Sequence, residues 1–135
     1  MFKFLEKHKT SLVYVPLVLY WLILLTLTTL PGADLPDIGV VDKVNHFVAY
    51  FGLAVLLSLT LLLQTKYELF YRKAFLFTFL IIIIYGALDE IHQIFIPGRS
   101  ADILDWLSDA GGAFIGLLLV LLLVKMFKYK SSKFF

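Results

Sequence analysis

Apolar residues fall into four long stretches separated by short polar segments. The stretches cover residues 11–30, 44–63, 74–96 and 102–124, and the last becomes uninterrupted only from Ala110. About 20 apolar residues in a helix cross the roughly 30 Å hydrocarbon core of a bilayer. The pattern therefore predicts an all-α fold, an integral membrane four-helix bundle formed by a single domain over residues 1–135.

Composition agrees with a multi-pass membrane protein. Of the 135 residues, 61% are apolar and 16% charged, whereas soluble domains have about 45–50% and about 25%. The net charge of +2 excludes a strongly basic nucleic-acid binder, so we expect no nucleic-acid partner. The absence of cysteine excludes a thiol nucleophile and a cysteine-ligated metal.

The distribution of basic residues predicts the orientation in the membrane. Ten of them flank one side of the predicted bundle, namely Lys3, Lys7, Lys9, Lys66, Arg72, Lys73, Lys125, Lys128, Lys130 and Lys133. Only Lys43 and Arg99 fall on the other side. Because cytoplasmic segments carry the excess of Lys and Arg, both termini are predicted to be cytoplasmic. The basic C-terminal tail is then an anchor to anionic membrane lipids.

The acidic residues gather on the opposite, outer side. Eight of the ten lie in outer loops or outer helix ends: Asp34, Asp37, Asp42, Asp89, Glu90, Asp102, Asp105 and Asp109. At about 1.5 Å per residue, His46, Glu90 and Asp109 reach the same level, about 22–26 Å from the cytoplasmic helix ends. Charged groups at that depth are expensive unless they face the bundle interior. The sequence therefore predicts a polar site just inside the outer boundary.

Helical spacing predicts that these residues face inward. Asp102, Asp105 and Asp109 form one stripe that continues into Gly112 and Gly116, a close-packing motif that meets another helix. In the second stretch Asp42, His46 and Tyr50 repeat at four-residue intervals. In the third, Gly86, Glu90 and Gln93 share a face with Asp89 and His92 beside it. Trp106 is expected in an aromatic belt at the outer interface.

These motifs resemble the VanZ-like membrane protein family over about residues 31–120. The resemblance rests on Asp42-Lys43-x-x-His46-Phe47-x-x-Tyr50, Glu90-x-x-Gln93, Pro97-Gly98-Arg99-Ser100-x-Asp102-x-x-Asp105 and Gly112-Ala113-x-x-Gly116. It departs at Asp109, where the family pattern often has Asn, and at Trp106, which has no place in the pattern. The founding members are accessory proteins of glycopeptide-resistance clusters, associated with reduced susceptibility to teicoplanin. The resemblance thus implies a multi-pass protein of the bacterial cytoplasmic (inner) membrane.

The first functional hypothesis is a site that binds or handles a lipid-linked cell-wall precursor or a lipoglycopeptide in the outer leaflet. Such a ligand has a polar head and an apolar chain, which suits a polar pocket open to lipid. Arg99 offers a bidentate fork for phosphate or carboxylate, and its alternative role is a salt bridge to Asp102 or Asp105. The expected ligand-binding residues are Asp42, Lys43, His46, Tyr50, Glu90, Gln93, Arg99, Asp102, Asp105 and Asp109.

Other hypotheses stay open. A membrane-embedded hydrolase or transferase for a lipid-linked phosphate or sugar would use Glu90, Asp109 and His46 as catalytic groups. A divalent metal cofactor would be held by His46, Glu90 and His92, although their spacing matches no dedicated metal motif. Transport would require a homodimer, and the inner helix halves offer few polar residues for a path. A purely structural role would have the outer polar network lock the bundle.

Overall fold

The chain folds into a bundle of long helices with two short helices at one end. The computed structural model describes residues 1–32 and 42–130. The elements are α1 (Phe2–Lys7), the π-helix η1 (Thr10–Tyr14), α2 (Val15–Thr29), α3 (Asp42–Leu63), α4 (Glu68–Arg72), α5 (Ala74–Gln93) and α6 (Ile103–Met126). The predicted outer loop containing Asp34 and Asp37 lies outside the described residues, as does Lys133 in the tail.

The prediction of four membrane-spanning helices is confirmed. Four helical segments are long and apolar enough to cross a membrane: Thr10–Thr29, Asp42–Leu63, Ala74–Gln93 and Ile103–Met126. The third ends three residues earlier than predicted, because Pro97 disfavours helical backbone just before it. The last begins one residue later, because Asp102 caps α6 by accepting a hydrogen bond from the Leu104 amide at 2.8 Å.

A π-helical turn replaces α-helix at the start of the first span. Pro16 follows this turn and has no amide hydrogen to donate, so a regular α-helical hydrogen bond cannot form there. The helix nevertheless continues without a break from Thr10 to Thr29. The sequence prediction of one span with Pro16 near its beginning therefore agrees with the structure.

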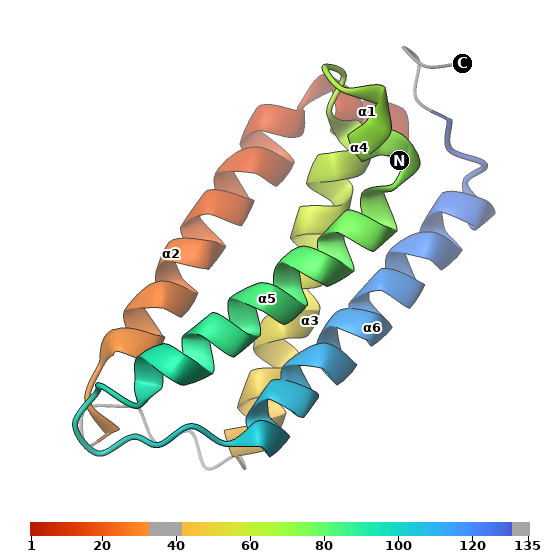
Figure 1. Cartoon of the computed structure of the whole chain (residues 1–135). Helices are drawn as coiled ribbons and strands as arrows, with labels where there is room; N and C mark the ends of the chain where they lie inside the picture. The colour runs from red at the N-terminus through yellow and green to blue at the C-terminus, as the bar shows by residue number, and fades with distance from the viewer. Residues whose placement is uncertain (33–41, 131–135) are drawn as a thin grey trace.

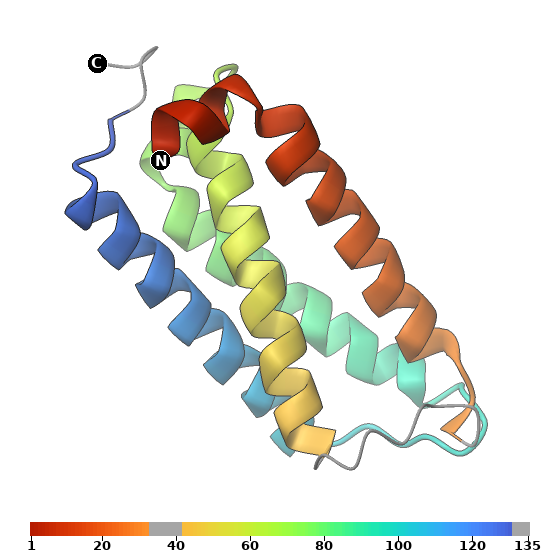
Figure 2. The same ribbon diagram turned by 180° about the vertical axis from the view of Figure 1, so that it is seen from behind.

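The bundle has two chemically different ends. Figures 1 and 2 show the N-terminus, α4 and the end of α6 at one end, with the α5–α6 connection and the start of α3 at the other. The described members of the group of ten Lys and Arg residues lie at the first end. The acidic residues at the start of α3, the end of α5 and the start of α6 lie at the second. The cytoplasmic location of both termini stays a prediction from this charge separation.

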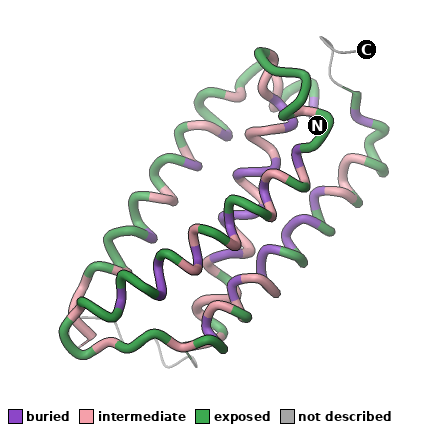
Figure 3. Tube along the Cα trace, in the orientation of Figure 1, coloured by how far each residue is buried: buried purple, intermediate pink, exposed green. Residues whose placement is uncertain are grey.

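Helix α2 is less buried in the bundle than α3, α5 and α6. Figure 3 shows buried positions along the facing sides of α3, α5 and α6, whereas α2 is mostly exposed or half-buried. Only Leu17 and Leu24 of α2 are buried. Leu53, Ala54 and Ile82 are fully buried at the centre of the bundle. Because α2 packs less closely against the bundle, space remains between α2 and α3.

Glycines bring α6 against α3. A Cβ atom added to Gly112 would overlap the backbone carbonyl oxygen of Phe47, and one added to Gly116 would lie 2.7 Å from the carbonyl oxygen of Phe51. The predicted close-packing role of Gly112 and Gly116 is confirmed, and the partner helix is α3. This contact sets the distance between two of the three helices that carry the polar residues.

Candidate functional site

Buried polar residues meet where α3 begins, α5 ends and α6 begins. The buried charged and amide side chains at this end of the bundle are Asp89, Glu90, Gln93, Asp105 and Asp109. Glu90, Gln93, Asp105 and Asp109 were expected there from the sequence. Asp89 was placed only beside the site, although it lies three residues after Gly86 and four before Gln93, spacings that share a helix face. The sequence spacing could therefore have predicted that Asp89 belongs to the site.

The innermost group consists of His46, Glu90 and Asp109 on three different helices. His46 Nδ1 lies 2.9 Å from Asp109 Oδ1. Glu90 Oε2 accepts a hydrogen bond from the Asp102 amide at 2.8 Å. The second oxygens of the two carboxylates, Glu90 Oε1 and Asp109 Oδ2, have no hydrogen-bond partner among the described residues. The predicted match in depth therefore corresponds to proximity in space.

Lys43 pairs with two carboxylates at the outer rim of the site. Its ammonium lies 2.9 Å from Asp102 Oδ2 and 3.2 Å from Asp105 Oδ1. Hydrogen bonding to Lys43 lowers the pKa of the Asp102 carboxyl below its ordinary value, and this keeps Asp102 ionised as the cap of α6. The Lys43 ion pairs therefore join α3 to α6 at the rim.

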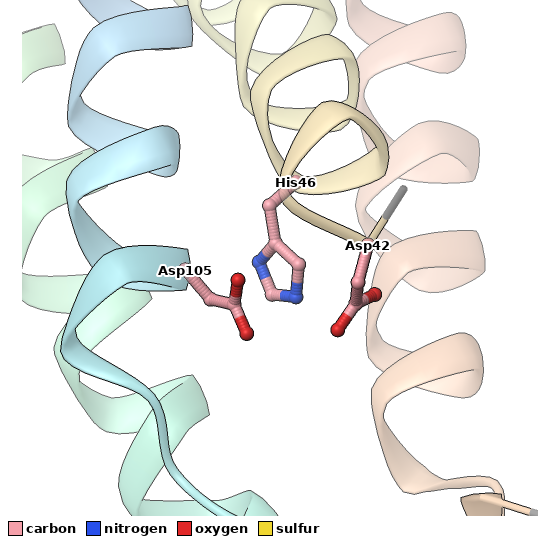
Figure 4. Close-up of side chains that lie close together, drawn as sticks. All are labelled: Asp42, His46 and Asp105. Atoms are coloured by element: carbon pink, nitrogen blue, oxygen red, sulfur yellow. The ribbon is translucent and has the colours of Figure 1, made fainter. Parts of the chain in front are cut away.

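His46 also faces a second pair of carboxylates nearer the rim. Figure 4 shows its imidazole ring between Asp42 and Asp105. Donor atoms of these three residues lie within 4.8 Å of one another, as do those of His46, Glu90 and Asp109. His46 therefore belongs to two groups of potential metal ligands, of which the second is the more deeply buried.

Tyr50 and Trp106 line the inner side of the site. The Tyr50 hydroxyl donates to Asp89 Oδ2 at 3.3 Å, and the Tyr50 ring lies nearly parallel to the His46 ring at 6.5 Å. Trp106 Nε1 donates to the carbonyl oxygen of Ile83 at 3.1 Å. This hydrogen bond joins Trp106 to α5, and the expected place of Trp106 in an interfacial belt stays a prediction.

Arg99 does not form the salt bridge that the sequence suggested, and its contact with a phosphate or carboxylate of a ligand stays a prediction. Its guanidinium donates to the carbonyl oxygens of Leu27 and Leu30 at the end of α2, and to Gln93 Oε1 at 3.2 Å. The expected salt bridge to Asp102 or Asp105 is wrong, because those carboxylates are paired with Lys43. Arg99 instead satisfies terminal carbonyl groups of α2, which a helix cannot satisfy within itself.

The structure does not bring His92 to the site. His92 is exposed, and the group of potential ligands around the buried carboxylates contains His46 but not His92. It lies two residues after Glu90, a spacing that places the two side chains on different helix faces. The grouping of His92 with His46 as metal ligands is therefore corrected.

A cavity of about 380 Å³ opens beside this group, between α2, α3 and α5. Its apolar wall comes mainly from α2 and its polar wall from α3 and α5. The lining residues are Tyr20, Ile23, Leu24, Leu27, Thr28, Asp42, Asn45, His46, Val48, Ala49, Tyr50, Asp89 and Arg99. A second groove, of about 400 Å³, runs between α5 and α6 and is lined by Glu90, Asp102 and Trp106 among others.

Four apolar spans and a buried polar group at one end define a multi-pass helical membrane protein. The chain belongs to the VanZ/LLP1 family, whose sequence model matches residues 3–124. The resemblance found in the motifs of α3, α5 and α6 is thus confirmed. Comparison with curated proteins gives no match, and neither does comparison with solved structures.

Proposed function

We propose that this VanZ-type protein binds the polar head and the adjoining apolar chain of a lipid-linked cell-envelope molecule or lipoglycopeptide. The observation that supports it is the cavity between α2, α3 and α5, which joins an apolar wall to a polar one. With the predicted orientation, the cavity lies in the outer leaflet of the bacterial cytoplasmic membrane. Both ligand classes present a polar head at that level.

The apolar part of the ligand would lie against α2. Ile23 and Leu27 line the cavity there, and Val48 lines it from α3 while 58% of its surface remains exposed. In a bundle that spans a membrane, such exposed apolar side chains face acyl chains. The cavity is therefore accessible from the side, and an acyl or polyprenyl chain can remain in lipid while its head enters.

The polar part of the ligand would meet mostly acceptors. Asp42 and Asp89 are carboxylates, and Asn45 adds an amide. Carboxylates accept hydrogen bonds from sugar hydroxyls and amines. Three guanidinium contacts hold Arg99 to Leu27, Leu30 and Gln93, and its remaining donors offer a contact for phosphate or carboxylate.

The proposal is tested by titrating the purified protein in lipid nanodiscs with teicoplanin. We expect saturable binding, and at least about tenfold weaker binding of a glycopeptide without an acyl chain, which is about 1.4 kcal/mol. A nanodisc without protein is the control for partition into lipid. A polyprenyl-linked cell-wall precursor forms the second arm of the experiment. Equal signals from protein-containing and empty nanodiscs with both ligands would contradict the proposal.

A further inference from the structure

Two buried carboxylate oxygens at the centre of the site have no partner among the described residues. They are Glu90 Oε1 and Asp109 Oδ2, on side chains that are 6% and 1% exposed as residues. A buried acceptor without a partner costs about 1–3 kcal/mol, and more when the group is charged. Two such oxygens on facing helices indicate that something else completes the group.

The surrounding cations are already engaged. Lys43 is paired with Asp102 and Asp105, and Arg99 is held by backbone carbonyls and Gln93. His46 contacts only one of the two buried carboxylates by hydrogen bond, at Asp109 Oδ1. A divalent cation bound by Glu90, Asp109 and a neutral His46 would bring the net charge of the group to zero. It would thereby remove the free-energy cost of burying two negative charges.

The three side chains are arranged for one ion. Donor atoms of His46, Glu90 and Asp109 lie within 4.8 Å of one another. Ligands that share a metal at about 2.0–2.2 Å lie about 3–4 Å apart, so side-chain movements of about 1 Å close the site. Each ligand comes from a different helix, and the close contact of α6 with α3 at Gly112 holds two of these helices together.

We propose that His46, Glu90 and Asp109 form a binding site for a divalent first-row metal ion such as Zn²⁺ or Mn²⁺. Imidazole and carboxylate donors suit these ions, and three protein ligands leave coordination positions for an oxygen of a bound molecule. The group of Asp42, His46 and Asp105 is less suited, because Asp42 is exposed and Asp105 holds Lys43. The site goes beyond the proposed function and does not depend on the proposed ligand.

The test uses the metal alone. Detergent-purified protein is dialysed against Zn²⁺ or Mn²⁺, and bound metal is measured by mass spectrometry and, for Mn²⁺, by electron paramagnetic resonance. We expect one equivalent in the wild type and at least tenfold weaker binding in the isosteric variants Glu90→Gln and Asp109→Asn. The matched control Asp105→Asn, at the rim of the same site, should keep the metal.

Two results would overturn the proposal. One is a wild-type protein that retains no stoichiometric metal after dialysis against either Zn²⁺ or Mn²⁺. The other is loss of metal in Asp105→Asn with retention in Glu90→Gln, which would move the site to the outer group. Size-exclusion profiles and circular dichroism of each variant separate loss of a metal ligand from loss of the fold. A wild-type protein without metal overturns the proposal even if a variant fails to fold.

Discussion

Gly112→Ala is expected to lower the unfolding free energy by about 1–3 kcal/mol, the usual cost of overpacking a tightly packed contact. The added methyl group would overlap the Phe47 carbonyl oxygen, which belongs to the backbone of α3 and cannot rotate away. The helices must then separate along the contact that places His46 beside Asp109. Unfolding of the detergent-solubilised protein, followed by circular dichroism against a denaturing detergent, measures the loss.

The neighbouring Gly111→Ala is the matched control. A methyl group there would lie 3.6 Å from the Phe47 ring, an ordinary van der Waals distance. Both substitutions gain the same helix propensity, about 1 kcal/mol, so Gly111→Ala should be neutral or stabilising. Equal stability of the two variants would mean that α6 does not contact α3 through Gly112.

Filling the cavity is expected to abolish most of the proposed ligand binding. Ala49 lines the cavity between α2, α3 and α5, and Ala49→Leu adds three carbon atoms to it. We expect at least about tenfold weaker teicoplanin binding in the nanodisc titration, because the larger side chain occupies the volume that the ligand head needs. The bundle itself should remain folded, since the added atoms enter existing space.

Ala87→Leu provides the comparison for this variant. Ala87 lines the groove between α5 and α6, so the same substitution adds the same volume outside the proposed cavity. Its affinity for teicoplanin should equal that of the wild type. Weaker teicoplanin binding by Ala87→Leu, with unchanged binding by Ala49→Leu, would place the ligand in the groove between α5 and α6.

Much of the fold was predictable because a membrane span has a strong local signal. Twenty apolar residues bounded by polar ones specify a helix wherever they occur, and the observed helix ends lie within three residues of those predicted. The stripe ending in Gly112 and Gly116 also predicted a close helix contact. Spacing within α6 alone could not show that the contact is with α3, since the partner depends on how the helices pack.

The site was predictable in its location and less so in its contacts. Matched depth identified His46, Glu90 and Asp109, because depth follows from counting residues along each helix. Arg99 was assigned to nearby carboxylates, whereas it bonds to Leu27 and Leu30, more than 65 positions away in the sequence. A long side chain in a turn can reach several helices, and only the packed bundle determines which acceptors are left for it.

Photo-crosslinking in living cells tests the central claim most directly. A photoreactive phenylalanine analogue at Val48 lies on the cavity wall, and one at Leu88 of α5 lies on an equally exposed position outside the residues lining the cavity. We predict that Val48 captures a lipid-linked cell-envelope molecule, recognised by mass spectrometry from its sugar and phosphate groups, while Leu88 captures only bulk phospholipid. Capture of the same phospholipids at both positions would contradict the account.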